Sequence, residues 1–324
     1  MRVKKIDISS DSNMWNQFVK ESKNSTFLFD RNFMDYHADR FLDYSLMIFD
    51  NEGQLLSAVP ANINSENQVI SHQGLSYGGF LLQKESKLVS TLIVVYHTLK
   101  FLHDQGIKVF LLKSFPWFYN VNPTDEIEYA LFLLDAELYR RDIAYVIDLQ
   151  NRIPYTGNIR REGNKAEKLT AIIKEDDSLD EFWNEVLSPN LMERFGVKPV
   201  HLLEEIKLLQ SYFPKNIKQF NVYLEEKVVA GTTLFITDKV VHCQYISSNE
   251  YGRKTGCLNY LFKHLMDNTF TDKRYFDFGI VNENGGRGIN SGMLFWKESF
   301  GGRAQKHDFY RINTANYKVL EPYI

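Results

Sequence analysis

The sequence predicts an α/β (α+β) protein of two similar halves, each a mixed, mainly antiparallel sheet flanked by helices. One order of elements, β-β-β-α-β-α-β, occurs twice along the chain. The length of 324 residues suits two domains of ordinary size. The pattern breaks at Gln150–Gly157, where a proline and a glycine follow a strand. We therefore expect one domain at residues 1–150 and a second at residues 151–324; two unrelated α/β halves are the alternative.

In the first half, alternating apolar and polar residues predict three strands before a long helix. Leu88, Leu92 and Leu99 recur at helical spacing, and Gly106 stands where helices commonly end in a left-handed glycine. A strand, a helix and a further strand complete this half. The expected elements are strands Tyr44–Phe49, Gln54–Ile63 and Gln68–His72, helix Lys87–Gln105, strand Lys108–Lys113, a helix with Thr124 as N-cap, and strand Ile143–Leu149.

The second half begins with a meander, because three strands of period 2 follow one another with only short turns between them. A helix with an apolar face comes next, followed by an apolar strand that contains a single acid, Asp277. The expected elements are strands Gln219–Glu225, Val228–Thr237 and Val240–Ser247, a helix across Leu258–Met266, strand Tyr275–Ile280, a helix near Ile289–Phe300 and a strand near Arg303–Ile312.

The composition argues against several classes of function. A formal net charge of −3, with 44% hydrophobic and 24% charged residues, predicts a globular protein without a stable nucleic-acid partner. No apolar run is long enough for a membrane span and no signal peptide is visible, so we expect a cytoplasmic location. Cys243 and Cys257 lack the spacing of a metal site, so we expect no metal. The motifs of P-loop kinases, zinc proteases and serine hydrolases are missing.

Three segments resemble those of one protein family. Phe295–Gly302 reads FWKESFGG and follows a strand and a glycine-rich loop. Phe27–His37 (FLFDRNFMDYH) and Ser71–Gly79 (SHQGLSYGG) lie in the N-terminal half. In sequence and order these segments resemble the Fem-type (FemAB-like) acyl- and aminoacyltransferases of the GNAT superfamily. The resemblance implies two tandem GNAT-like domains and acyltransferase activity.

The resemblance also implies roles for three substrate-binding residues. Lys297 lies in the family's KxxFG element, where the lysine contacts a negatively charged group of the acceptor; a surface lysine on an amphipathic helix is the alternative. Arg194 matches a position near the acceptor, and Tyr77 is expected to shape the groove that holds it. For both, ordinary loop or turn chemistry is the alternative.

The resemblance further implies a cradle for the pyrophosphate of an acyl-CoA donor. In GNAT proteins that use acetyl-CoA, this cradle is a glycine-rich turn that opens a helix, because a helix N-terminus presents N–H groups to anions. The matching residues are Gly252, Arg253, Lys254, Thr255 and Gly256. They depart from the full Q/R-x-x-G-x-G/A pattern, so solvated turn charges are the alternative.

Three residues are candidates for the catalytic acid or base. His242 lies in the strand that is expected to diverge from the next one, and histidine titrates near neutral pH. Glu283 directly follows that next strand, and strand ends in such folds open onto clefts. Asp277, inside the strand, is either a tuned acid or a structural anchor, because a buried carboxyl group needs a partner. A structural histidine and a solvated loop acid are the alternatives for His242 and Glu283.

We expect, from these residues and the resemblance, transfer of an acyl group onto an amine or hydroxyl of a phosphate-bearing acceptor. A nucleotide- or lipid-linked sugar in cell-envelope polysaccharide synthesis fits that description. Acyl-CoA is the expected donor. Aminoacyl transfer from aminoacyl-tRNA onto a peptidoglycan precursor is the first alternative. A non-catalytic ligand-binding protein on a GNAT scaffold is the second.

Overall fold

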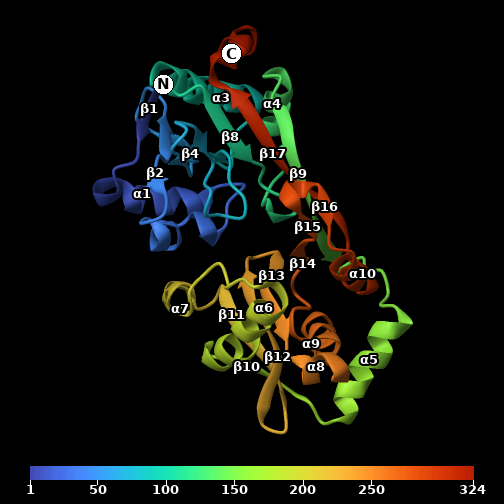
Figure 1. Ribbon diagram of the computed structural model, residues 1–324. Helices are drawn as coiled ribbons and strands as arrows, with labels where there is room; N and C mark the ends of the chain where they lie inside the picture. The colour runs from blue at the N-terminus through green and yellow to red at the C-terminus, as the bar shows by residue number, and fades with distance from the viewer. The chain divides into compact units, whose positions relative to one another are not determined.

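The computed structural model describes residues 1–324, which form two compact units (Figure 1). Unit 1 comprises Met1–Asp142 and Lys306–Ile324, and unit 2 comprises Ile143–Gln305. The expected domains, 1–150 and 151–324, cut the chain at a single point. The observed division differs because the C-terminal end of the chain packs into unit 1.

Two long strands account for this difference. β9 (Glu137–Asp148) begins in unit 1, and its residues 144–148 pair antiparallel with β14 (Tyr275–Ile280) of unit 2. β17 (Arg303–Asn313) begins in unit 2, and its residues 309–313 pair antiparallel with β8 (Val109–Lys113) of unit 1. Each unit therefore completes its sheet with a strand that starts in the other unit.

In unit 1, β1, β3, β4 and β7 form an antiparallel sheet in that order, and β6 pairs parallel with β8. Helix α3 buries Leu92, Leu99 and Leu102 in the core of the unit and ends, as expected, before Gly106, whose φ is +78°. The elements are β1 (Arg2–Lys5), α1 (Ile8–Glu21), α2 (Arg31–Met34), β2 (Leu42–Asp43), β3 (Leu46–Phe49), β4 (Leu55–Val59), β5 (Asn62–Ile63), β6 (Val69–Ile70), β7 (Leu81–Leu82), α3 (Leu88–Asp104), β8 and α4 (Glu126–Leu133).

Two expectations for unit 1 were wrong. The strand expected at Gln54–Ile63 is interrupted, because Pro60 has no N–H to donate to a neighbouring strand. Thr124 is not the N-cap of α4, which begins after Asp125. The hydroxyl of Thr124 instead accepts a hydrogen bond from the side chain of Asn120 at 2.7 Å.

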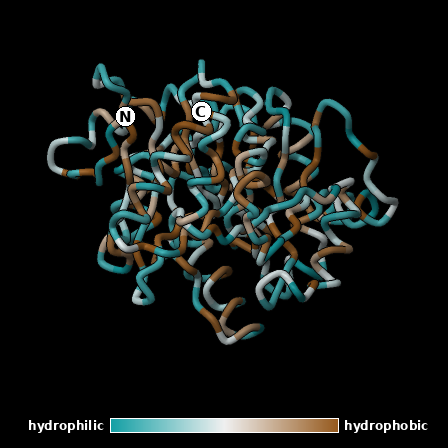
Figure 2. The backbone as a smooth tube through the Cα atoms, turned by 90° about the horizontal axis from the view of Figure 1, so that it is seen from above, coloured by the Kyte–Doolittle hydropathy of each residue, from teal (hydrophilic) through white to brown (hydrophobic).

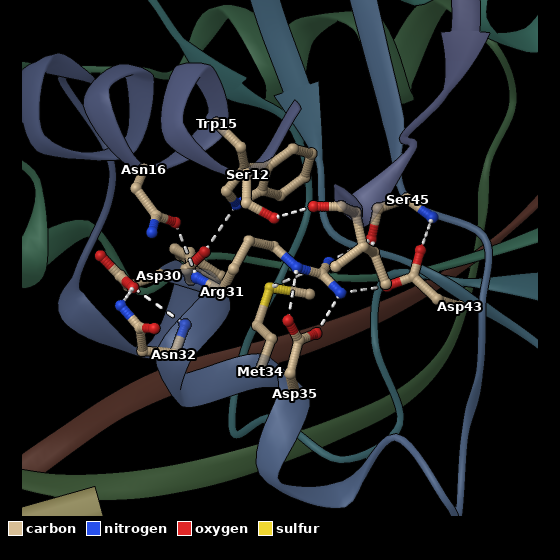
Figure 3. Close-up of polar contacts among 12 residues, drawn as sticks. Ser12, Trp15, Asn16, Asp30, Arg31, Asn32, Met34, Asp35, Asp43 and Ser45 are labelled. Carbon is tan, nitrogen blue, oxygen red and sulfur yellow. Dashed lines mark hydrogen bonds and ion pairs between the residues drawn. The ribbon is translucent and has the colours of Figure 1, made fainter. Parts of the chain in front are cut away.

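A buried ion-pair cluster joins α1, α2 and the first strands of unit 1 (Figure 3). The guanidinium of Arg31 is buried, lies over the ring of Trp15, and pairs with the carboxylates of Asp35 and Asp43. The hydroxyl of Ser45 lies 3.4 Å from Nη1 of Arg31. A buried cation with two carboxylate partners is already neutralised, so this cluster fits a structural role.

Unit 2 contains the expected meander. Its strands lie in the order β10-β11-β12-β13-β14-β9, and every neighbouring pair is antiparallel except β13 and β14. The elements are α5 (Gly157–Lys168), β10 (Ile172–Asp176), a π-helical segment (Phe182–Leu187), α6 (Ser188–Phe195), α7 (Leu203–Tyr212), β11 (Ile217–Leu224), β12 (Lys227–Ile236), β13 (Val240–Ser248), α8 (Glu250–Thr255), α9 (Cys257–His264), β14, β15 (Asn282–Glu283), β16 (Gly288–Ile289) and α10 (Ser291–Ser299).

The two faces of this sheet have different neighbours. Cys243 of β13 and Phe276 of β14 belong to the core formed with α9. On the opposite face, Tyr245 packs against Trp183, whose indole N–H donates to Thr233 at 3.2 Å. Figure 2 colours the backbone by hydropathy, with teal residues in many of the outer turns. His242, on the Tyr245 face, therefore points away from the core.

Candidate active site

The parallel pairing of β13 and β14 ends at His242 and Asp277, which lie opposite each other. Beyond this pair β13 continues to Ser248 and β14 to Ile280 without pairing to each other. The expected divergence of the two strands is confirmed, and it begins at the two candidate residues. Backbone polar groups that face the gap between diverging strands are free for a ligand, because a parallel partner would otherwise bind them.

A β-bulge lies next to this point in β13. Thr233 and Leu234, consecutive in β12, pair with Tyr245 and Cys243, which leaves Gln244 as an extra residue. A bulge bends its strand and increases its twist. The bend is consistent with the separation of β13 from β14 immediately after His242.

Gly279 makes the matching irregularity in β14. Its φ of +71° is a conformation that favours glycine, and the pairing of β14 with β9 is interrupted around it. The N–H of Gly279 donates to Oδ1 of Asp277 at 2.7 Å. A Cβ at this position would lie 3.4 Å from Cε1 of His242. The glycine thus supplies the backbone turn beside the imidazole.

His242 and Asp277 form a hydrogen-bonded pair, with Nδ1 of the imidazole 2.8 Å from Oδ2 of the carboxylate. Asp277 is buried, whereas the side chain of His242 is 20% exposed. A carboxylate on Nδ1 fixes the ring and directs Nε2 away from it. The pair has the arrangement of a general base and the acid that orients it.

Lys297 reaches the end of β14 from α10. Its Nζ donates to the carbonyl oxygens of Gly279 at 2.9 Å and Ile280 at 2.8 Å, and its side chain is buried. Burial lowers the pKa of Lys297 to about 8, although the charge of Asp277 acts in the opposite direction. An ammonium has three N–H donors, so one remains for a ligand. The alternative of a surface lysine was wrong.

The segment expected to cradle a pyrophosphate is a short helix. α8 has six residues, and the side chain of its N-cap, Asn249, accepts a hydrogen bond from the N–H of Gly252 at 2.9 Å. Arg253 donates to the side chain of Asn190 and to the carbonyl of Ser248. The helix therefore uses one of its N-terminal donors and its arginine within the protein.

Packing accounts for the remaining residues of this segment. A Cβ at Gly252 would lie 2.4 Å from the carbonyl oxygen of Val229, and one at Gly256 would lie 2.4 Å from that of Glu162. The Thr255 hydroxyl donates to the carbonyl of Tyr251, and Lys254 pairs with Glu250 on the surface. These contacts fit a packing role for Gly252 and Gly256. The segment does not form an open, glycine-rich loop.

The other candidate residues contact partners other than His242 and Asp277. Glu283 is exposed in β15, and its carboxylate accepts a hydrogen bond from Asn290 at 3.0 Å. Arg194 is exposed in the last turn of α6 and lies over the ring of Phe195. Tyr77 is buried in unit 1, where its hydroxyl lies 3.0 Å from that of Thr26. The structure thus groups His242, Asp277 and Lys297.

Two backbone irregularities, at Gly279 and Gln244, and one side-chain contact were not predicted from the sequence. Glycine inside an apolar strand is typical of a bulge, and this signal could have identified Gly279. No local signal marks Gln244, because the bulge depends on pairing with β12. The side-chain contact is a hydrogen bond of 2.6 Å between Nδ1 of His201 and the hydroxyl of Tyr245. These two residues are far apart in the sequence.

Comparison with known proteins agrees with this geometry. The family described as the acetyltransferase (GNAT) domain matches residues 155–288, which include β13 and β14. The match places a GNAT domain in unit 2. The expected class of enzyme, an acyltransferase, is the class to which the matched domain family belongs. No curated protein matches the chain.

Solved structures show that the chain has a tandem GNAT fold over nearly its whole length. FemX is 10% identical, with 98% of this chain and 99% of that chain covered and a TM-score of 0.67. The C-terminal domain of a putative lysylphosphatidylglycerol synthetase from Agrobacterium fabrum is 11% identical, with 96% and 94% covered and a TM-score of 0.63. A tandem GNAT protein from the clavulanic acid biosynthesis pathway is 8% identical, with 97% and 98% covered and a TM-score of 0.53. The fold expected from the sequence is confirmed.

Proposed function

We propose that this GNAT protein transfers an acyl group onto an amine or hydroxyl at the point where β13 and β14 separate. The proposal rests on one observation, the grouping of His242, Asp277 and Lys297 around the carbonyl end of β14. Acyl transfer needs a base and a group that stabilises the oxyanion. Here His242, oriented by Asp277, is the base, and the ammonium of Lys297 stabilises the oxyanion.

In this mechanism Nε2 of His242 takes the proton of the acceptor's amine or hydroxyl as that group attacks the acyl carbon. The carbonyl electron pair moves to oxygen, and the third N–H of Lys297 donates a hydrogen bond to the oxyanion. Collapse of the tetrahedral intermediate breaks the bond from the acyl carbon to the donor. The leaving group takes the proton back from His242, and Asp277 holds the ring in place throughout.

We propose an aminoacyl ester, such as an aminoacyl-tRNA, as the donor. The capped, six-residue helix α8 supports this choice, because its arginine and lysine pair within the chain and it offers no glycine-rich loop to a pyrophosphate. The esters of aminoacyl-tRNA carry their leaving group on a ribose and need no such loop.

Acyl-CoA is the second candidate donor. It is favoured by the match of residues 155–288 to the acetyltransferase (GNAT) domain family. A coenzyme A bound here would require groups outside α8 to neutralise its phosphates, and the exposed guanidinium of Arg194 in α6 is a candidate.

The proposed acceptor carries a phosphate, as in a nucleotide- or lipid-linked sugar of the cell envelope or a peptidoglycan precursor. Arg194 supports an anionic acceptor: its guanidinium is exposed and lies against an aromatic ring instead of a carboxylate. Helix α6, which carries Arg194, is tied to β13 by a hydrogen bond of 3.0 Å between Asn190 and Ser247. The guanidinium is thus held on an element attached to the strand of His242.

The test is a donor assay with the acceptor amine in excess and the product detected by mass. Purified protein is incubated separately with aminoacyl-tRNA and with acetyl-CoA, each with and without the Lys297→Met substitution. We expect transfer from aminoacyl-tRNA that the substitution abolishes or strongly reduces. Transfer from acetyl-CoA alone would replace the first donor by the second. Transfer from either donor that is unaffected by Lys297→Met would contradict the proposed site.

A further inference from the structure

Unit 2 exposes an unusual number of apolar side chains in one short segment, Met192–Leu202, which comprises the last turn of α6 and the loop after it and is here named the apolar loop. Five apolar residues in these eleven positions are half exposed or more. Their exposed fractions are 50% for Met192, 53% for Phe195, 50% for Val197, 77% for Val200 and 62% for Leu202. Single exposed apolar residues are normal, but a concentrated patch marks a surface that contacts something else.

Both ends of the apolar loop are fastened to β13, the strand that carries His242. Before the loop, Asn190 donates to the hydroxyl of Ser247 at 3.0 Å. At its far end, the buried His201 bonds to the hydroxyl of Tyr245 at 2.6 Å through its side chain and at 3.1 Å through its backbone N–H. Whatever the loop contacts is therefore brought close to the strand of the proposed base.

The charged residues of the apolar loop indicate the kind of partner. Arg194 and Lys198 are exposed and outnumber the single acid, Glu193. The guanidinium of Arg194 lies 5.2 Å from the centre of the ring of Phe195, so cation and apolar surface are presented together. Apolar side chains that enter the acyl boundary, flanked by cations that meet anionic headgroups, are the pattern of interfacial membrane binding.

A second copy of the chain fits this loop less well than a lipid surface does. In a symmetric dimer each copy contributes the same patch, so two surfaces with a net positive charge would be brought together. Anionic headgroups instead complement both cations. Contact of this kind needs no membrane span, and no helix of the protein is long and apolar enough to be one.

We infer that the apolar loop docks on an anionic lipid surface and so positions β13 over it. If the proposed function holds, docking also identifies the acceptor. It is then a phosphate-bearing compound that is carried by the lipid surface. The acceptor's amine or hydroxyl would then approach His242 from the side of the sheet that Tyr245 and Trp183 share.

The experiment measures binding of the full chain to vesicles by flotation. Vesicles of phosphatidylcholine mixed with phosphatidylglycerol are compared with vesicles of phosphatidylcholine alone. The test variant is Val197→Glu with Val200→Glu, and the matched control is Phe132→Glu, which changes an equally exposed apolar residue in α4 of unit 1. We expect binding to the mixed vesicles only, reduced about tenfold or more in the test variant and unchanged in the control.

Absence of binding to the mixed vesicles would overturn the inference, as would an equal loss in Phe132→Glu. A concentration-dependent dimer that the test variant abolishes would assign the loop to a second copy instead. Failure of the proposed function is distinguishable. Lys297→Met should still bind vesicles, and the test variant should still turn over a water-soluble acceptor.

Discussion

His242 and Asp277 are the last residues at which β13 and β14 pair, and their side chains are joined by a hydrogen bond of 2.8 Å. The point where the strands separate and the point where a base is oriented are therefore the same. The carboxylate also accepts the N–H of Gly279, the residue that turns β14. One buried acid thus supports both the backbone and the imidazole.

Asp277→Asn is expected to lower kcat by about 10²–10⁴. An amide has one acceptor oxygen and an NH₂ group, so if the oxygen keeps the N–H of Gly279, the NH₂ group donates to Nδ1 of His242. The imidazole proton then lies on Nε2, which can no longer take a proton from the acceptor. Loss of the charge-assisted hydrogen bonds of the carboxylate should also lower the free energy of unfolding by about 1–3 kcal/mol. The measurements are kcat well below the melting temperature and urea unfolding.

Glu283→Gln decides between the two candidate bases. Glu283 is exposed and bonded to Asn290, so we expect this substitution to have little effect on kcat. A loss as large as that of Asp277→Asn would instead assign the base to Glu283, one of the three candidates from the sequence.

Lys297→Met should lower kcat/KM by roughly ten- to over a hundredfold, because one charge-assisted contact to the transition state is worth about 1.5–3 kcal/mol. The carbonyls of Gly279 and Ile280 also lose their donor, so the variant should be less stable. Lys297→Arg should not restore activity, because a planar guanidinium does not fit a buried site shaped for an ammonium. Kinetics at a temperature where both variants are folded separate the two effects.

The stability of the protein should rise with pH above about 8. Burial lowers the pKa of Lys297 from 10.5 to about 8, so between these values the unfolded chain binds more protons than the folded one. The free energy of unfolding then increases with pH in that window, and the penalty for a buried charge is fully present below it. Lys297→Met should flatten this rise, which urea unfolding at about pH 7 and about pH 10 measures.

Lys113 provides the matched variant for this measurement. Its pKa is also lowered to about 8 by burial, and its Nζ donates to the carbonyls of Gln73 and Leu75 in unit 1. Lys113→Met should remove a second, independent part of the increase in the free energy of unfolding with pH. An unchanged slope in both variants would contradict the lowered pKa values.

Much of the fold follows from periodicity in the sequence, because burial of one face imposes it. Tyr275–Ile280 is a strand with the expected bounds, and the meander of β11, β12 and β13 lies within two residues of its predicted ends. The exchange of β9 and β17 was not predictable in the same way. Strands that are far apart in the sequence leave no local pattern that shows which of them will pair. The sequences of β9 and β17 therefore look like those of ordinary strands at the end of each half.

The candidate site was predicted only in part, for the same reason. His242, Asp277 and Lys297 were identified as single residues, but their grouping depends on the bulge at Gln244 and the turn at Gly279. Both irregularities are set by neighbouring strands. The glycines of α8 show the reverse case, where a composition that suggests a phosphate cradle is explained by close packing.

The close packing around Gly252 can be tested by substitution. Gly252→Ala should lower the free energy of unfolding by about 1–3 kcal/mol, because its Cβ would lie 2.4 Å from the carbonyl oxygen of Val229. Gly157→Ala is the matched control: no atom lies within 4 Å of a Cβ there, so this change at the start of α5 should be neutral or slightly stabilising. The measurement is urea unfolding, together with the KM for acetyl-CoA if transfer from it is observed. A stable Gly252→Ala protein with a raised KM would support α8 as a pyrophosphate cradle. The glycine would then be needed for the approach of a ligand and not for packing against Val229 of β12.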